Sequence, residues 1–224
     1  MWWQSESLIK FVSPSILYIS GPTMSGKSCL TKRILEHCNA MFTQQVTKII
    51  YAYSEWQSLY DEMKKTVDNL EFYQGLPDRE AMQCFGSTKQ HVILCIDDLF
   101  MQVTQSEDAV QLFCVFSHHL NISVIFLAQS LYPPGRFSKT LSLQVQYYFL
   151  LRNRRDKRQV ITFASQLFPS KSKYMLDAYE KCTERVDYNY LLIDISPSVD
   201  QRYQLRSNIF PGETTVCYLP LDYK

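Results

Sequence analysis

Short runs of apolar residues alternate along the chain with segments of helical periodicity. Strands are predicted at 15–20, 48–53, 70–75, 91–97, 122–128, 145–151 and 190–195. Helices are predicted at 27–39, 57–65, 107–119, 156–167 and 172–181. Unbroken apolar runs are typical of strands buried on both faces. The alternation therefore predicts an α/β fold with a central, mostly parallel sheet flanked by helices.

The 224 residues are expected to form one domain, 1–224, in which the tail at 197–224 adds edge strands at 203–206 and 215–219. A hydrophobic content of 46% with 14% aromatic residues excludes a disordered or fibrous chain. The net charge of +1 argues against a protein that coats nucleic acid through bulk charge. Residues 1–112 nevertheless carry a net charge of −4 and residues 113–224 a net charge of +5, so a local basic site is compatible with the total.

Several features predict an intracellular protein that is not secreted. The seven cysteines include no CxxC pair and several lie in apolar runs, which favours buried reduced thiols over a disulfide framework or a zinc site. The first residues, MWWQSESLIK, lack the basic end and apolar stretch of a signal peptide. The apolar runs are too short for a transmembrane segment, so no membrane segment is expected.

The most specific motif is GPTMSGKS at 21–28, which fits the phosphate-binding loop (P-loop) pattern GxxxxGK[ST] between a predicted strand and a predicted helix. Two glycines let the backbone N–H groups point at a phosphate chain, and the helix start adds its positive dipole end. Lys27 would reach the β- and γ-phosphates, and the Ser28 hydroxyl would ligate Mg²⁺. The alternative is a tight turn without a ligand. The predicted ATP site comprises Gly21, Pro22, Thr23, Met24, Ser25, Gly26, Lys27, Ser28 and Cys29.

An enzyme with such a loop also needs a carboxylate near Mg²⁺, at the end of a buried strand. The segment HVILCIDD at 91–98 supplies it. Asp97 would hold Mg²⁺ through water, and Asp98 would orient or deprotonate the attacking water. ATPases with this layout more often have Glu at the second position, and Asp is one methylene shorter. On their own, the two acids would be interpreted as an ordinary helix cap.

Gln129 ends the strand at 122–128, at the sheet edge where open α/β sheets bind ligands. It could contact the γ-phosphate or its water, or it could simply bond to local backbone. The basic run RNRRDKR at 152–158 includes Arg154 and Arg155. Such a run is usually a solvated face, but it could supply an arginine finger to a neighbouring subunit or line a DNA path. Arg136 is another candidate finger.

Together these segments resemble a known family. An additional strand, KIIYAY, lies between the P-loop strand and the strand of Asp97 and Asp98, and Gln129 ends the next strong strand. The succession SHH…NISVIFLAQ…P…R…LRNRRD is similar to that of viral genome-packaging ATPases of the HerA/FtsK superfamily. It resembles most closely those of Polinton/Maverick elements and adintoviruses, and poxvirus packaging ATPases more distantly. The resemblance runs from the P-loop to LLIDISP and RSNIFP.

The resemblance implies an additional-strand (ASCE, RecA-like) P-loop ATPase. It further implies a homo-oligomeric ring, often a hexamer, that drives double-stranded DNA into a preformed capsid. Capsid portal or vertex proteins would be partners, and the host nucleus or a viral factory would be the location, with association with the virion. The resemblance places Lys27 and Ser28 at nucleotide and Mg²⁺, Asp97 and Asp98 in the acidic motif, and Gln129 in the sensor position. Asp98 departs from the Glu that is usual in the superfamily.

Two alternatives remain open from the sequence. A nucleotide or nucleoside kinase would use the RNRRDKR cluster as a lid over a phosphate acceptor. A non-catalytic nucleotide-binding assembly factor would carry Asp98 as a degraded base.

Overall fold

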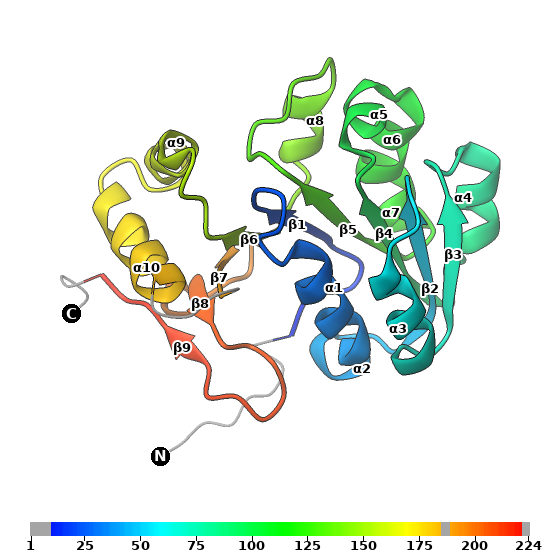
Figure 1. The fold of residues 1–224 in the computed structure, drawn as a ribbon, viewed down its shortest axis with the longest axis horizontal. Helices are drawn as coiled ribbons and strands as arrows, with labels where there is room; N and C mark the ends of the chain where they lie inside the picture. Colours follow the sequence, from blue (N-terminus) through cyan, green and yellow to red (C-terminus); the bar gives the residue numbers. More distant parts are fainter. Residues whose placement is uncertain (1–9, 185–188, 221–224) are drawn as a thin grey trace.

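The computed structural model describes residues 10–184 and 189–220, and these form one mixed sheet of nine strands (Figure 1). The strand order is β3-β2-β4-β5-β1-β6-β7-β8-β9. The first six strands in this spatial order, from β3 to β6, are parallel to their neighbours. Strands β7, β8 and β9 then pair antiparallel, each with the strand before it in this order. The strands are β1 Ile16–Ser20, β2 Val46–Tyr53, β3 Leu70–Gln74, β4 His91–Asp97, β5 Ile122–Ala128, β6 Tyr147–Leu151, β7 Tyr190–Asp194, β8 Leu205–Ser207 and β9 Val216–Cys217. The predicted fold class is confirmed.

The strand that separates β1 from β4 in the sheet is β5, with Ile16 paired to Val124 and Leu94 paired to that same residue from the other side. The KIIYAY strand, β2, lies between β1 and β4 along the chain but pairs with the outer side of β4. Consequently the carboxyl ends of β1, β5 and β4 lie side by side (Figure 1). Because the P-loop, Gln129 and the two acids lie at these strand ends, they come to one edge of the sheet.

Helices cover both faces of the sheet, in two unequal layers (Figure 1). One layer consists of α1 Lys27–Glu36, α2 Cys38–Met41 and α3 Ser58–Thr66. The other consists of α4 Arg79–Phe85, α5 Phe100–Gln105, α6 Glu107–Gln111, a π-helical turn at Leu112–Phe116, α7 Ser117–His119, α8 Ser138–Ser142, α9 Lys157–Leu167 and α10 Ser172–Glu184. A short 3₁₀ helix, Gln201–Tyr203, precedes β8.

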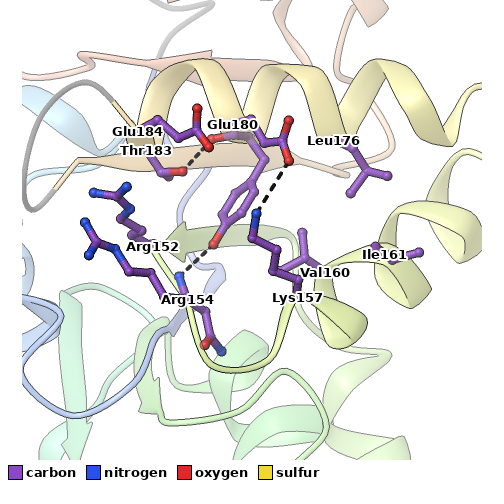
Figure 2. Close-up of a pocket in the computed structure, with 11 residues that line it drawn as sticks. Arg152, Arg154, Lys157, Val160, Ile161, Leu176, Glu180, Thr183 and Glu184 are labelled. Carbon is purple, nitrogen blue, oxygen red and sulfur yellow. Dashed lines mark hydrogen bonds and ion pairs between the residues drawn. The ribbon is translucent and has the colours of Figure 1, made fainter.

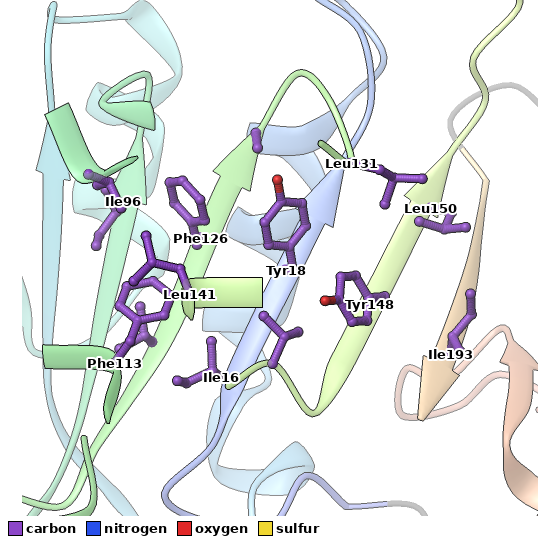
Figure 3. Close-up of a cluster of buried hydrophobic side chains, with 14 of the residues drawn as sticks. Ile16, Tyr18, Ile96, Phe113, Phe126, Leu131, Leu141, Tyr148, Leu150 and Ile193 are labelled. Carbon is purple, nitrogen blue, oxygen red and sulfur yellow. The ribbon is translucent and has the colours of Figure 1, made fainter. Parts of the chain in front are cut away.

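Alternation along the strands divides the buried side chains into two cores. In β1, Ile16 and Tyr18 face the larger layer (Figure 3), whereas Leu17 and Ile19 face α1 to α3. Every residue of β1, β4, β5, β6 and β7 is buried, which explains why these strands are continuous apolar runs in the sequence. Burying apolar surface on both faces provides the dominant stabilisation and fixes the strand ends that carry the polar site.

Several predicted elements have different bounds in the structure. The helix predicted at 27–39 ends at Glu36, and His37 separates it from α2. The helix predicted at 107–119 contains a π-helical turn, and it follows a helix, α5, that was not predicted. Helices α4 and α8 were also not predicted, because each is seven residues or shorter and shows little helical periodicity. Segments 203–206 and 215–219 do contribute edge strands, although β9 has only two residues.

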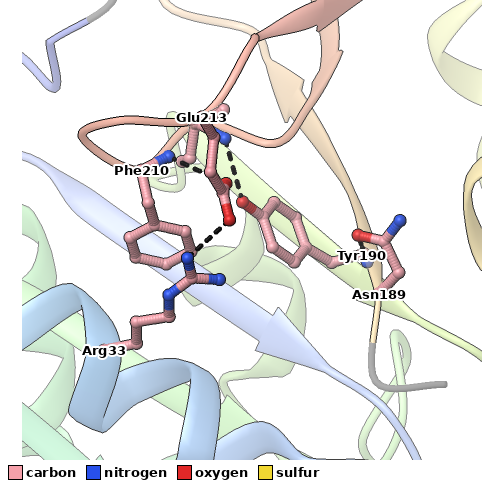
Figure 4. Close-up of polar contacts among 6 residues, drawn as sticks. Arg33, Asn189, Tyr190, Phe210 and Glu213 are labelled. Carbon is pink, nitrogen blue, oxygen red and sulfur yellow. Dashed lines mark hydrogen bonds and ion pairs between the residues drawn. The ribbon is translucent and has the colours of Figure 1, made fainter. Parts of the chain in front are cut away.

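The loop between β8 and β9 returns to the helix that follows the P-loop (Figure 4). The Arg33 guanidinium of α1 stacks over the Phe210 ring at 3.9 Å and pairs with the Glu213 carboxylate. The Phe210 backbone N–H donates to the other Glu213 oxygen, and the Ile209 N–H donates to the Tyr190 hydroxyl at 3.2 Å. The C-terminal edge of the sheet is therefore tied directly to α1.

Two expectations about the whole chain can be compared with the described residues. No helix within 10–184 or 189–220 is long and apolar enough to cross a membrane. All seven cysteines are free thiols. Cys38, Cys95 and Cys182 are buried as expected, whereas Cys29 and Cys84 are exposed, so the expectation of buried thiols was wrong for those two.

Candidate nucleotide-binding site

The P-loop spans the gap between the end of β1 at Ser20 and the start of α1 at Lys27. Its two glycines have separate physical roles. Gly26 adopts φ 94°, a left-handed conformation that favours glycine. At Gly21, an added Cβ would lie 2.5 Å from Ser25 Oγ and 2.9 Å from Leu151 Cβ, so only glycine fits there. The sequence pattern thus corresponds to a tightly curled loop packed against β6.

Lys27 is buried at the first position of α1, and its ammonium group turns back over the loop. Nζ donates to the carbonyl oxygens of Gly21 at 2.8 Å and Pro22 at 3.0 Å. Burial lowers the pKa of Lys27, and the charges of Asp97 and Asp98 oppose this. A cation held at the loop with few protein partners of opposite charge is well suited to bind phosphate oxygens.

Asp97 lies at the end of β4 and receives three hydroxyl groups on one carboxylate oxygen. Its Oδ2 accepts from Ser28 Oγ at 2.9 Å, from Tyr51 OH at 2.7 Å and from Tyr60 OH at 3.2 Å. Burial is the main cause that raises the pKa of Asp97, and Asp98 adds to it, whereas the three hydroxyl donors act in the opposite direction. The structure therefore joins the P-loop serine to the carboxylate that was predicted to hold Mg²⁺.

The donor set at this point suits a hard divalent cation. Mg²⁺ prefers oxygen ligands and usually retains water and substrate phosphate oxygens in its coordination shell. The Ser28 hydroxyl and the Asp97 carboxylate supply such oxygens side by side. Over the described ranges, no three or more His, Cys, Asp or Glu side chains gather into a group that could hold a metal ion. The residues thus fit an ion that is completed by nucleotide and water.

Asp98 is exposed and adopts φ 54°, a conformation uncommon for residues other than glycine. Its Oδ2 accepts from Gln57 Nε2 at 3.3 Å. Such strained backbone positions occur often at functional sites, where surrounding structure maintains them. The role of Asp98 in activating water stays a prediction.

Gln129 and the basic run both reach the P-loop of their own chain. A hollow of about 500 Å³ is lined by Pro22, Thr23, Gln129, Asn153, Arg155, Asp156 and Gln159. A second hollow of about 470 Å³ is lined by Pro22, Thr23, Met24, Ser25, Arg152, Arg154 and Arg155. The arginines face the loop in cis, which the sequence could not indicate.

The turn that carries these arginines is fixed by Asn153. Its Oδ1 accepts from the backbone N–H groups of Arg155 at 3.0 Å and Asp156 at 2.9 Å. The Asn153 N–H in turn donates to Tyr179 OH at 2.8 Å, which links the turn to α10. On the far side of the turn, Arg152 and Arg154 border a third pocket of about 310 Å³ between α9 and α10 (Figure 2).

Arg136, the other candidate finger, lies away from these hollows. Its guanidinium pairs with Glu107 of α6 at 3.6 Å and stacks over Phe137 at 4.8 Å. Its side chain is 70% exposed, so it remains available to a partner.

Tyr51, Tyr60, Asn153 and Gln159 were not identified from the sequence. Gln159 Oε1 accepts from Ser130 Oγ and from the Leu131 N–H, both at 2.9 Å, and so anchors the segment after Gln129. The tyrosines reach Asp97 because β2 pairs with β4 and α3 follows β2. Identifying the two tyrosines would have required the order of the strands in the sheet, which local sequence patterns do not give.

The fold is that of the P-loop NTPases of the additional-strand (ASCE, RecA-like) type. The chain is similar to the genome packaging NTPase B204 from Sulfolobus turreted icosahedral virus 2. For its complex with AMP, the TM-score is 0.53 at 16% identity, over 81% of this chain and 93% of that chain. For the complex with AMPPCP, the TM-score is 0.52 at 15% identity, over 92% and 98%.

ATPases 2 and 3 of EssC from Geobacillus thermodenitrificans are also similar, with a TM-score of 0.55 at 13% identity, over 94% of this chain and 40% of that chain. Comparison of the sequence with protein families and with curated proteins finds no match. At these identities the likeness concerns the fold, and the residues of the site carry the argument about function.

Proposed function

We propose that this protein is an ATP-hydrolysing motor that translocates double-stranded viral DNA into a preformed capsid. It would act as a homo-oligomeric ring at a capsid portal or vertex, in the host nucleus or a viral factory. The observation that carries the proposal is the Ser28–Asp97 contact beside a curled P-loop. The fold shared with B204, a genome packaging NTPase, over nearly the whole of both chains supports it. The resemblance of the sequence to viral genome-packaging ATPases supports double-stranded DNA as the substrate.

Each residue would have a defined part in hydrolysis. Lys27 would place a positive charge against the β- and γ-phosphates, and Ser28 with Asp97 would hold Mg²⁺. When bound, Mg²⁺ neutralises phosphate charge and orients the phosphate chain. Asp98 and Gln129 would orient the attacking water from the neighbouring strand ends. Arg154 and Arg155 would supply positive charge over the same loop.

The proposal is tested by the ATP hydrolysis rate measured against both DNA and protein concentration. A motor is expected to show a specific activity that rises with protein concentration as subunits assemble, and a further rise with double-stranded DNA. A rate that is independent of DNA at every protein concentration would contradict translocation.

Removing the charges at the site is expected to abolish hydrolysis. Lys27→Ala and Asp97→Asn should each lower the rate about 10²-fold or more, because each removes a charge from the phosphates or the metal. Lys32→Ala is the matched control, since Lys32 lies on the same helix but pairs with Glu62 at 3.1 Å. Near-normal turnover in either site variant would exclude this nucleotide site.

The same assays separate the two alternatives. A nucleotide or nucleoside kinase would be active as a monomer, would require a phosphate acceptor and would ignore DNA. The position of the arginines over their own P-loop is compatible with a kinase lid, so acceptor nucleosides and nucleotides should be included. A non-catalytic assembly factor would bind ATP without steady-state turnover.

A further inference from the structure

Two buried tyrosines from different elements converge on the carboxylate that is proposed to hold Mg²⁺. Tyr51 lies on β2 and Tyr60 on α3, and neither side chain is exposed. Both hydroxyl groups donate to Asp97 Oδ2, at 2.7 Å and 3.2 Å. Ser28 Oγ donates to this same oxygen at 2.9 Å. Over the described chain, every hydrogen bond to the Asp97 side chain therefore ends on Oδ2.

This arrangement has more donors than one oxygen accommodates well, since a carboxylate oxygen offers about two lone-pair sites. One of the three hydroxyl groups can therefore leave at little cost. Ser28 is the one with another expected partner, the metal ion. If Ser28 were to bind Mg²⁺ instead, Tyr51 and Tyr60 would still donate to Oδ2, and Oδ1 would be free to help hold the ion.

The direction of the Tyr60 hydroxyl is fixed by its ring. Tyr60 packs against Tyr51, Tyr53, Trp56 and Phe72, with ring centroids between 5.1 and 5.5 Å away. The Lys64 ammonium lies 4.3 Å from the Trp56 ring centroid and 5.6 Å from that of Phe72. Rings held on several sides leave the hydroxyl little freedom, so it restrains the carboxylate plane as well.

We propose that Tyr51 and Tyr60 are positioning residues that orient Asp97 so that its Oδ1 faces the magnesium-bound nucleotide. The inference rests on the proposed function of this site. Partners that orient a metal-binding carboxylate typically contribute 10- to 100-fold to metal affinity. The two tyrosines would also couple α3 and β2 to the metal site, because a shift of either element would turn the carboxylate.

The test uses Tyr51→Phe and Tyr60→Phe in the full chain, with Tyr53→Phe as the matched control. Tyr53 belongs to the same aromatic cluster, and its hydroxyl donates to no other described residue. Binding of Mn²⁺ in the presence of AMPPCP is measured by electron paramagnetic resonance, and AMPPCP binding is measured separately without metal. Thermal unfolding without ligand shows whether each variant is folded.

We expect each of the two variants to weaken Mn²⁺ binding about 10-fold while AMPPCP binding without metal is unchanged. The control should bind Mn²⁺ like the wild type. Folded variants with Mn²⁺ affinity within about twofold of the control would overturn the inference. Tyr60→Phe alone decides the question if Tyr51→Phe does not fold, because Tyr60 lies on a separate helix.

The titration needs no hydrolysis, so it distinguishes two kinds of failure. Wild-type protein that binds Mn²⁺ with AMPPCP but does not hydrolyse ATP contradicts the motor, and the variants still decide the role of the tyrosines. Wild-type protein that binds no metal with the nucleotide contradicts both proposals.

Discussion

The Asp97 carboxylate is buried, and the exposed fraction of the residue is only 2%. Burial raises its pKa because a charged group is poorly solvated in the protein interior, and the neighbouring Asp98 disfavours a second negative charge. The hydroxyl groups of Tyr51, Ser28 and Tyr60 compensate only partly. The carboxylate that would hold Mg²⁺ is thus expected to destabilise the ligand-free fold at neutral pH.

The loss of stability caused by burying this charge can be measured by replacing Asp97 with a neutral residue. The folded-state pKa lies above the unfolded value of 3.8, so the group favours folding below pH 3.8 and this contribution is lost as the pH rises through the folded pKa. Asp97→Asn should therefore gain stability relative to the wild type between pH 4.5 and pH 7.5, by about 1.4 kcal/mol for each unit by which the folded pKa exceeds the lower of these two pH values. Urea unfolding of the ligand-free protein at both pH values measures the difference.

Asp61→Asn is the control variant, because this carboxylate is exposed to solvent in the folded protein. Addition of Mg²⁺ and ATP should raise the unfolding midpoint of the wild type more than that of Asp97→Asn, because binding to the folded state stabilises it and the variant lacks the carboxylate for the metal. A variant that loses stability relative to the wild type as the pH rises would contradict the assignment of a raised pKa.

At the scale of elements, an ion pair between neighbouring strands supports the antiparallel half of the sheet. Arg206 of β8 and Asp194 at the end of β7 are buried, and Arg206 Nη2 lies 2.8 Å from Asp194 Oδ2. Asp194 Oδ1 also accepts from the N–H and the hydroxyl of Ser196. The pair therefore connects β7, β8 and the turn between them.

Arg206→Met is expected to destabilise the fold by about 3–5 kcal/mol, because it leaves the Asp194 charge buried without its partner. The double variant Arg206→Met/Asp194→Asn should recover part of this loss, since Asn removes the charge and can still accept from Ser196. Urea unfolding provides the values. Arg202→Met, at an exposed pair with Asp200, should leave stability nearly unchanged. Equal losses in the single and double variants would exclude the unpaired charge as the cause.

Strong strands were predictable because both of their faces are buried. The bounds of β4 and β5 agree with the predicted 91–97 and 122–128, and each strand contains an uninterrupted run of four or more apolar residues. Short helices such as α4 and α8 depend on tertiary packing rather than on their own periodicity, so the sequence did not indicate them. The break between α1 and α2 at His37 likewise has no strong local signal in the sequence.

The site was predictable where one contiguous motif defines it. Gly21, Gly26, Lys27 and Ser28 lie in one loop whose spacing already encodes its geometry. The partners of Asp97 come instead from β2 and α3, and their proximity depends on β2 pairing with β4. Likewise, the position of the basic run over its own P-loop depends on β6 pairing with β1. Strand order is a property of the whole sheet.

At the scale of the whole molecule, the P-loop is enclosed on two sides by the same chain. Strands β6 and β5 flank β1, the strand that leads into the P-loop. Arg154 and Arg155 follow β6 on one side of the loop, and Gln129 follows β5 on the other. Both arginines are exposed at the rim of this hollow. They therefore occupy a position from which they could act on nucleotide bound to their own subunit.

Mixed assemblies distinguish action within one subunit from action between subunits. Arg154→Ala/Arg155→Ala subunits are combined with Lys27→Ala subunits, and ATP hydrolysis is measured with and without double-stranded DNA. If the arginines serve their own P-loop, each mixture should stay as inactive as its components, because every subunit lacks one part of its own site. Affinity of the arginine variant for DNA should be unchanged in that case. Hydrolysis restored by mixing would instead show a finger that acts between subunits, and lost DNA affinity without restoration would place the basic run on the DNA path.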